Sequence, residues 1–218
     1  MSNLLVNYRM TSSILVISRY NEDIEWVRKY DNKIIYNKGD RTTIVEDMQS
    51  YVIDIPNIGR EAHTFLYYII EHYDNLPDIV VFSQGRYDDH SFMSSYIFDS
   101  LFILDEDGYS KNLMETREWE HSASTYEFRI TNWKGSIVPT VRNENYGQWY
   151  ERVFNKPFPI EQTNMYAGAF FSVTSNIIRK HQKEYYINIM ENGDLKESSA
   201  PEAAHFMERS WSKMFTPY

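Results

Sequence analysis

Several short polar segments contain the residue types that binding and catalysis use. Asp88-Asp89-His90 follows an apolar run that ends in Ser83-Gln84-Gly85. Two adjacent carboxylates and an imidazole just past a strand can hold a hard divalent cation such as Mg²⁺ or Mn²⁺, or supply a general base. The alternative is a solvated loop whose aspartates cap the next helix. Asp105-Glu106-Asp107-Gly108 is a literal D-x-D, although acidic residues followed by glycine commonly form a turn.

Two further segments contain groups suited to a nucleotide. Arg19-Tyr20-Asn21 offers a cation, a flat aromatic ring and an amide that can pair with a base or a ribose. It predicts a nucleoside-binding loop or, alternatively, a helix entry capped by Asn21. Asn57 and Arg60 lie at the entry to a long predicted helix, where free backbone N–H groups and a guanidinium favour a diphosphate. A capped helix with a surface arginine is the alternative.

The last predicted helix has two distinct faces at helical spacing. One face is polar and contains His205, Glu208, Arg209 and Ser212. The opposite face is apolar and contains Ala203, Met207, Trp211 and Phe215. The polar face could place an acid/base pair over a site, or it could be an ordinary solvent-exposed face.

The predicted elements in the first 85 residues alternate between strands and helices. Apolar or alternating runs predict strands at 13–18, 33–36, 51–55 and 78–82. Helices are predicted over 23–30 and from an N-cap at Asn57 to Tyr73. Strands covered on both faces and alternating with helices indicate an α/β fold with a mixed, mostly parallel sheet flanked by helices. In such sheets ligands bind beyond the carboxyl ends of the strands, where these polar loops fall.

Beyond residue 90 the pattern is looser. It predicts a helix from 93 to 102, strands at 126–130 and 169–173, a helix at 176–190, and a last helix opened by Ser199 and Glu202 and ending at Phe215. No repeat and no Gly-, Pro- or Ser-rich linker divides the chain, so we expect one domain over 1–218.

Composition excludes several classes of protein. The 218 residues contain no cysteine, which rules out disulfide scaffolds, thiolate zinc sites and thiol nucleophiles. The net charge of -9 makes nucleic acid a poor partner. Aromatic residues make up 16% of the chain, and such side chains pack on sugar and nucleoside rings as well as in cores. No apolar run could span a membrane and no signal peptide is evident, so we expect a soluble, cytoplasmic protein.

Taken together, the loops resemble a family of small glycosyltransferase-like proteins of large DNA viruses, fungi and bacteria. The resemblance rests on Ile14–Asp23, Tyr36–Asp40, Asn57–Glu61 with His63, Phe82–Gly85, and His205–Trp211. The layout is also similar to the GT-A (Rossmann-like) nucleotide-sugar fold of chlorovirus-type capsid glycosyltransferases. That similarity implies a UDP-sugar donor and Mn²⁺, with Mg²⁺ as the alternative metal. If the protein is viral, its expected cytoplasmic location is that of an infected host cell. The similarity divides the domain into a nucleotide-binding half (1–90) and an acceptor-side half (91–218).

The sequence departs from the GT-A plan at its metal motif. Where D-x-D should close the fourth strand, it has Ser83-Gln84-Gly85. Either Asp88 and Asp89 take over the metal role, or the enzyme works without a metal, or catalysis has been lost.

We therefore expect a glycosyltransferase that moves a sugar from a nucleoside diphosphate donor to a glycan or glycoprotein acceptor. Nucleotide contacts are assigned to Arg19, Tyr20, Asn21, Asp40, Asn57, Arg60, Gln84 and Gly85. Asp88 and Asp89 are assigned to the metal, and Glu208 or His205 to the base. The alternatives are a carbohydrate- or nucleotide-sugar-binding protein without turnover, and a phosphate-ester hydrolase that uses Asp88, Asp89 and His90.

Overall fold

A five-stranded sheet organises the chain in the computed structural model, which describes residues 11–87, 98–104, 125–131, 134–137, 141–160 and 169–215. The strands are β1 (Ser13–Arg19), β2 (Lys33–Asn37), β3 (Val52–Asp54), β4 (Ile79–Gln84) and β5 (Phe170–Thr174). Their order is β3-β2-β1-β4-β5. The first four run parallel, and β5 pairs antiparallel with β4. The predicted α/β class and mixed, mostly parallel sheet are confirmed.

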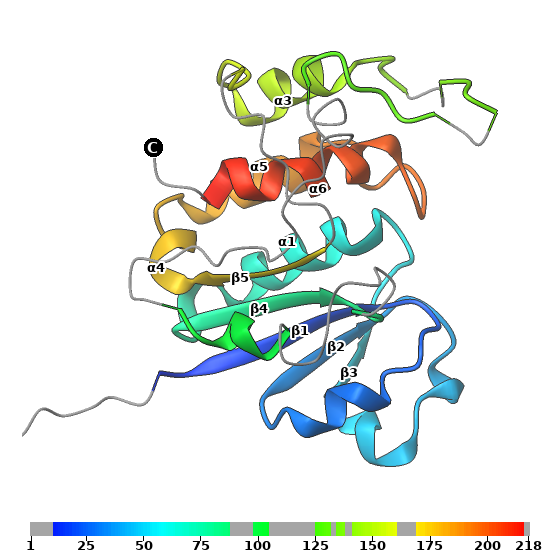
Figure 1. Cartoon of the computed structure of the whole chain (residues 1–218), viewed down its shortest axis with the longest axis vertical. Helices are drawn as coiled ribbons and strands as arrows, with labels where there is room; N and C mark the ends of the chain where they lie inside the picture. The colour runs from blue at the N-terminus through cyan, green and yellow to red at the C-terminus, as the bar shows by residue number, and fades with distance from the viewer. Residues whose placement is uncertain are drawn as a thin grey trace, which may run out of the picture.

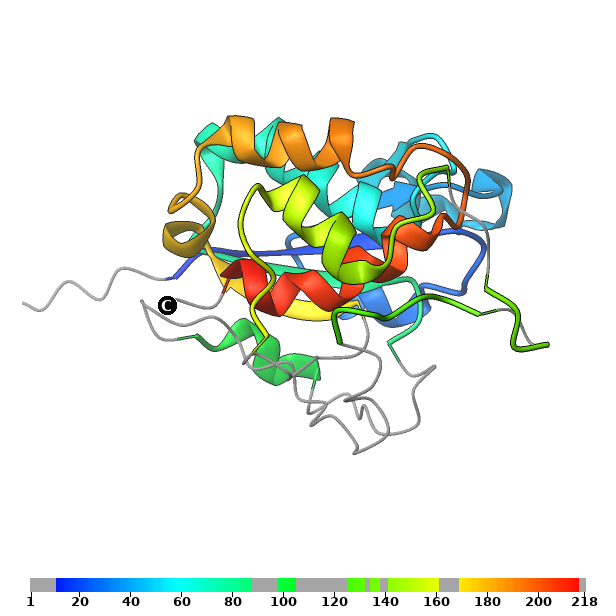
Figure 2. The same ribbon diagram turned by 90° about the horizontal axis from the view of Figure 1, so that it is seen from above.

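Helices cover the two faces of the sheet unequally. The α-helices are α1 (Arg60–His72), α3 (Tyr146–Phe154), α4 (Ser175–Ile178), α5 (Lys183–Asn192) and α6 (Glu202–Phe215). The 3₁₀ helices are η1 (Glu25–Lys29), η2 (Arg41–Thr43), η3 (Glu46–Tyr51), η4 (Tyr73–Asn75) and η5 (Ser100–Phe102). Figure 1 shows α1, α5 and α6 over one face, with α3 beyond them; η5 lies on the opposite side from α1 and α5 (Figure 2).

Alternating side chains of the buried strands supply two cores. Val16, Val80 and Phe82 face the core shared with α1, α3, α5 and α6. Leu15, Ile17 and Val81 face the other core, which residues of η1, η3 and η5 complete. Both faces of β1 and β4 are therefore covered, which explains their continuous apolar sequences.

Three predicted elements differ in the structure. The 23–30 helix is the 3₁₀ helix η1, and the 176–190 helix is divided into α4 and α5. The predicted strand at 126–130 is wrong: this segment forms a turn, and its neighbourhood contains an isolated bridge between Thr131 and Ile137. Most of the helix predicted from 93 to 102 lies outside the described residues. In the described part of the chain, every helix is too short or too polar to cross a bilayer.

Candidate functional site

The loops after β1, β2 and β4 form one continuous surface at the carboxyl edge of the sheet. Trp26 Nε1 donates to the Gly85 carbonyl oxygen at 2.9 Å, and Asp40 N donates to Asn21 Oδ1 at 2.8 Å. Glu22 lies so close to Gly85 that a Cβ atom there would be 2.6 Å from Glu22 Oε2. A side chain at position 85 would therefore displace the Glu22 carboxylate, and the parallel strands bring the predicted loops together.

Arg19 lies beneath this surface. Its side chain is 2% exposed. The guanidinium donates to Asn37 Oδ1 at 2.6 Å, to Thr43 Oγ1 at 2.6 Å and to the Glu22 carbonyl oxygen at 3.0 Å. Burial lowers the pKa of Arg19, and the nearby charges of Glu22 and Asp40 act in the opposite direction. Arg19 therefore holds the loops in place, and the contact with a nucleoside predicted for it stays a prediction.

Other predicted nucleoside contacts lie at the surface of these loops. Tyr20 is 52% exposed, Asn21 and Asp40 are exposed, and Gln84 is partly exposed. Asp40 accepts hydrogen bonds from Thr42 Oγ1 at 2.7 Å and Thr42 N at 2.8 Å, which lower the pKa of its carboxyl group. An aromatic ring and an ionised carboxylate are thus accessible at the edge where a nucleotide was predicted.

The entry to α1 differs from its prediction. Asn57 is not the N-cap; Gly59 is, with a left-handed φ of 61°, and Arg60 follows with a φ of 47°. The Gly59 and Arg60 N–H groups donate to the carbonyl oxygens of Ser198 and Ser199 at 2.8 and 3.0 Å. These two donors are therefore used within the protein and are not available to a diphosphate, while the contact of Asn57 and Arg60 with the sugar donor stays a prediction. The Arg60 side chain is 35% exposed.

Charged side chains from three distant segments meet beside this helix entry. Arg60 Nη1 lies 3.1 Å from both ring nitrogens of His205, and Arg60 Nε lies 3.4 Å from Glu61 Oε2. Glu208 Oε2 lies 4.0 Å from both His205 Nδ1 and Arg209 Nη1. Lys38 Nζ donates to the carbonyl oxygens of Ile58 and Arg60. We call Lys38, Arg60, Glu61, His205, Glu208 and Arg209 the edge cluster.

The polar face of α6 is not an ordinary solvent-exposed face. The side chains of His205, Glu208 and Arg209 are only 21%, 17% and 12% exposed. The guanidinium of Arg209 lies over the Phe128 ring at 4.0 Å. The predicted apolar face is confirmed, because its members are buried: Ala203, Met207, Trp211 and Phe215. Ser212, which was assigned to the polar face, is also buried.

Burial makes charge unfavourable on several groups of the edge cluster. It lowers the pKa of Lys38 to about 8. Burial, with the Arg60 charge acting in the same direction, lowers the pKa of His205 to about 4, so the imidazole is neutral at pH 7. Burial raises the pKa of Glu61, as does the charge of Glu208, while Arg60 lowers it. The cluster thus combines cations with a neutral imidazole and a carboxyl group whose proton is held unusually tightly, a combination typical of functional sites.

The predicted metal ligands Asp88 and Asp89 lie outside the described residues, as do Asp105 and Asp107. Among the residues that are described, no three His, Asp or Glu side chains are placed to hold a metal ion. The two carboxylates of the edge cluster lie among the cations Lys38, Arg60 and Arg209. These positive charges would repel a divalent metal ion, and too few oxygen ligands are left to hold it. We therefore derive no metal-dependent step from the edge cluster.

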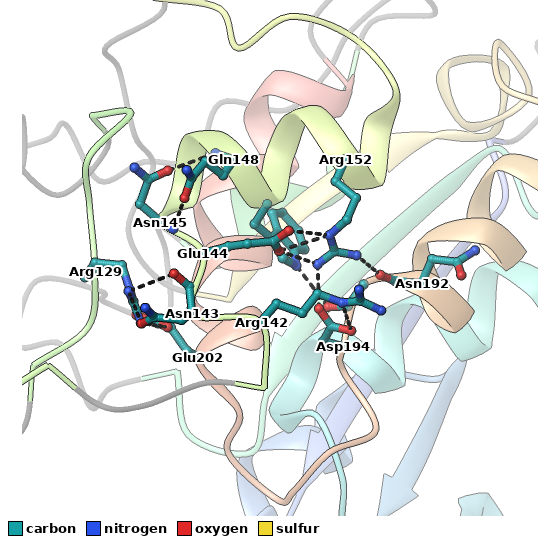
Figure 3. A network of polar contacts seen from close by, with 12 residues as sticks. Arg129, Arg142, Asn143, Glu144, Asn145, Gln148, Arg152, Asn192, Asp194 and Glu202 are labelled. Carbon is teal, nitrogen blue, oxygen red and sulfur yellow. Dashed lines mark hydrogen bonds and ion pairs between the residues drawn. The ribbon is translucent and has the colours of Figure 1, made fainter.

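A second polar network fixes the elements around α6 (Figure 3). Arg152 of α3 donates to Glu144 at 2.6–3.0 Å and pairs with Asp194, which also pairs with Arg142. Arg129 forms two hydrogen bonds with Glu202 of α6, at 3.0 and 3.1 Å. We call this the α3 network, and its members are Arg129, Arg142, Asn143, Glu144, Asn145, Gln148, Arg152, Asn192, Asp194 and Glu202. It attaches α3 and the 192–202 segment to α6.

Sequence reasoning assigned no functional role to Lys38, Glu61 or Arg209. A signal for two of them was present. Lys38 directly follows β2, and Glu61 lies in the first turn of the helix after β3. Both positions face the carboxyl edge of a parallel sheet, where ligands bind.

Comparison with known proteins identifies the family. The profile of a family described as "Protein of unknown function (DUF3431)" matches residues 14–217. The chain belongs to this family. The matched range includes every residue of the edge cluster and of the α3 network. No curated protein and no solved structure matched the chain.

Proposed function

We propose that this member of the DUF3431 family is a glycosyltransferase with a GT-A-like sheet. It would move a sugar from a nucleoside diphosphate donor, UDP in our assignment, to a glycan acceptor. The observation that carries the proposal is the contact of Arg60 with His205 across a separation of 145 residues, with Glu208 lying 4.0 Å from the same imidazole. Cations, a carboxylate and an imidazole are thereby gathered, and these are the groups that would support the departure of a diphosphate and the deprotonation of a hydroxyl.

The strand order supports a nucleotide at the same edge. The chain adds β2 on one side of β1 and β4 on the other, so the direction of winding reverses between β1 and β4. In open α/β sheets ligands bind at this reversal, beyond the carboxyl ends of the strands. The loops there contain Tyr20, Asn21 and Gln84, and Asp40 is hydrogen-bonded to Asn21. We assign the nucleoside to this surface.

The proposed reaction exchanges one C–O bond for another. The acceptor oxygen attacks the anomeric carbon while the bond from that carbon to the diphosphate breaks, and the diphosphate leaves with the bonding electrons. Arg60 and Arg209 are assigned to the negative charge on the leaving group. Glu208 is assigned to the acceptor proton, with the neutral His205 as the alternative base.

A metal remains part of the proposal through residues outside the described range. Asp88 and Asp89 are our assigned ligands for Mn²⁺ or Mg²⁺, which would neutralise charge on the diphosphate. Two double variants test this assignment by their effect on Mn²⁺-stimulated UDP binding. We expect Asp88→Asn/Asp89→Asn to abolish it and Asp105→Asn/Asp107→Asn to retain it. Loss of Mn²⁺-stimulated UDP binding in the second variant alone would contradict it.

The test of the proposed function is release of UDP from a panel of UDP-sugars in the presence of oligosaccharide acceptors. We expect turnover in the wild type and a loss of at least about tenfold in Arg60→Gln, because a charged contact to the diphosphate is removed. Arg142→Gln is the matched control, since this arginine belongs to the α3 network and is paired with Asp194. Binding of UDP-sugar without UDP release would favour a binding protein, and release of inorganic phosphate would favour a hydrolase.

A further inference from the structure

A groove of about 440 Å³ lies between α1 and α5, next to the edge cluster. Its α1 wall contains His63, Tyr67 and Ile70, and its α5 wall contains Ile187 and Met190. Side chains at positions i, i+4 and i+7 share one face of a helix, so the α1 wall is a continuous stripe about 10 Å long. The volume is in the range of small-molecule sites, and the walls are mostly apolar.

His63 is the exception among these apolar side chains. It is 6% exposed, and its Nδ1 atom has no hydrogen-bond partner within the described part of the protein. Burial, with the charges of Lys38 and Lys196, lowers the pKa of this imidazole to about 4, so it is neutral at pH 7. An unpartnered buried polar atom is costly for a folded protein, and it is unusual enough to need an explanation. The Nδ1 atom is itself buried, so the groove presents mainly apolar atoms to a ligand.

The rim of the groove favours an uncharged ligand. Its charged residues are Glu71, Glu191 and Lys196. Lys196 Nζ already donates to Glu191 Oε1 at 2.6 Å. The remaining charge is therefore negative, and together with a neutral imidazole it provides no attraction for a phosphate or a carboxylate. A bare sugar is a poor fit as well, since its many hydroxyl groups would find few partners on these walls.

The groove and the edge cluster are neighbours along the chain and through Ile58. Pro56 and Ile58 line the groove, and the Ile58 carbonyl oxygen accepts a hydrogen bond from Lys38 Nζ. His63 lies one helical turn after Arg60 on α1. An elongated molecule could therefore place a polar head at the edge cluster and an apolar tail along α1.

We propose that the groove binds the apolar chain of the acceptor, so that the acceptor is an alkyl- or isoprenyl-linked hydroxyl compound such as a glycolipid. Its role as an acceptor rests on the proposed function, whereas binding of the chain does not. The hydroxyl-bearing head would lie at Glu208 and Arg60, and the chain would pack between Tyr67 and Ile187.

The experiment measures binding of octyl β-glucoside to the full chain by calorimetry, below the concentration at which this detergent forms micelles. Methyl β-glucoside, which has the same head and no chain, is the comparison ligand. Ile187→Trp fills the groove from a position that is 37% exposed, and Ile103→Trp is the matched control at an 81% exposed position outside the groove. We expect octyl β-glucoside to bind at least tenfold more tightly than methyl β-glucoside. Ile187→Trp should remove most of that difference, and Ile103→Trp should retain it.

Equal affinity for the two glucosides, or no effect of Ile187→Trp, would overturn the proposal. If Ile187→Trp does not fold, Ile187→Asp places a charge in the groove and should weaken binding in the same way. The two proposals fail differently. Chain-dependent binding without any UDP release would overturn the role as an acceptor together with the proposed function. UDP release that is no faster with octyl than with methyl β-glucoside would overturn the lipid acceptor alone.

Discussion

The edge cluster and the α3 network are both built from arginine and carboxylate side chains, yet their charges are balanced differently. In the α3 network, burial alone would lower the pKa of Arg152, but its hydrogen bond to Glu144 and the charge of Asp194 raise it. In the edge cluster, burial lowers the pKa of Lys38 and His205 and raises that of Glu61. The charged state is favoured in one region and disfavoured in the other.

This difference indicates what each region does. Arg152 and Glu144 form several short hydrogen bonds to each other, so a ligand would have to break them in order to bind. In the edge cluster, burial disfavours the charged forms of Lys38 and His205, and perturbed pKa values of this kind are typical of functional sites. We therefore regard the α3 network as structural and the edge cluster as the candidate active site.

The largest effect should come from breaking the buried pair of the α3 network. Arg129→Met leaves Glu202, whose side chain is fully buried, without its charged partner. We expect the free energy of unfolding to fall by about 3–5 kcal/mol in a denaturant titration. The double variant Arg129→Met/Glu202→Gln, which leaves no buried charge, should recover part of the loss. A cost under 1 kcal/mol would mean that the pair is not structural.

A somewhat smaller effect should appear in the pH dependence of stability. The pKa of His205 is about 4 in the folded protein, against 6.5 for an ordinary histidine. Between these values the unfolded chain binds a proton that the folded chain does not, so stability falls as the pH is lowered from 6.5 to 4. The contribution of His205 is on the order of 3 kcal/mol.

The measurement is a series of denaturant titrations from pH 7 to pH 4 on the wild type and His205→Asn. The variant should lose part of the slope. His63, whose pKa is also about 4, should account for much of the remainder. Comparing the two proteins isolates the imidazole from Glu61, whose raised pKa changes stability in the opposite direction. Identical slopes would show that His205 is not held neutral by its surroundings.

The next effect is on turnover. Glu208→Gln nearly preserves the shape of the side chain but removes the base, so we expect UDP release with acceptor to fall on the order of a hundredfold while UDP affinity is retained. Glu144→Gln, the equivalent change in the α3 network, should lower the melting temperature and leave the turnover of the folded protein within a few-fold of wild type. If Glu208→Gln stays equally active, His205 becomes the candidate base.

The sequence predicted those strands and helices whose apolar residues are dictated by burial in the core. The apolar runs of β1, β4 and β5 and the stripe of α1 are found where we expected them, because burial on both faces of a strand or on one face of a helix dictates residue type. The strand expected at 126–130 failed for a different reason. Its alternating residues do not face a neighbouring strand: Phe128 packs on Phe206 and Arg209, and Arg129 binds Glu202.

Contacts between distant segments explain the errors at the candidate site. Asn57 resembles an N-cap in sequence, but the carbonyl oxygens of Ser198 and Ser199 accept the hydrogen bonds at this helix entry. The residues His205 and Glu208 could be selected from the sequence because they share a helix face. The position of Lys38 and Glu61 at the carboxyl edge of the sheet could also be predicted, but their burial could not, since it depends on how the folded chain covers them.

The smallest predicted effect is a difference in stability between two variants of Arg60, which distinguishes the cost of its strained backbone from the role of its charge. A φ of 47° is left-handed, which is unfavourable for a residue with a Cβ atom and acceptable for glycine. Both Arg60→Gly and Arg60→Ala remove the guanidinium, and both should lose UDP release. Arg60→Gly, however, should be more stable than Arg60→Ala by about 1 kcal/mol in a denaturant titration, because only alanine retains the strain.

Asn155, the C-cap residue of α3 with a φ of 50°, provides the matched position beside the α3 network. Asn155→Gly should likewise be more stable than Asn155→Ala, but with no change in turnover. If the glycine and alanine variants are equally stable at Arg60 and differ at Asn155, the helix entry relaxes when the arginine is removed. In that case the Arg60 side chain, through its contact with His205, imposes the strained backbone conformation. The strain would then be a consequence of the edge cluster, as expected of an active site held together against its local preferences.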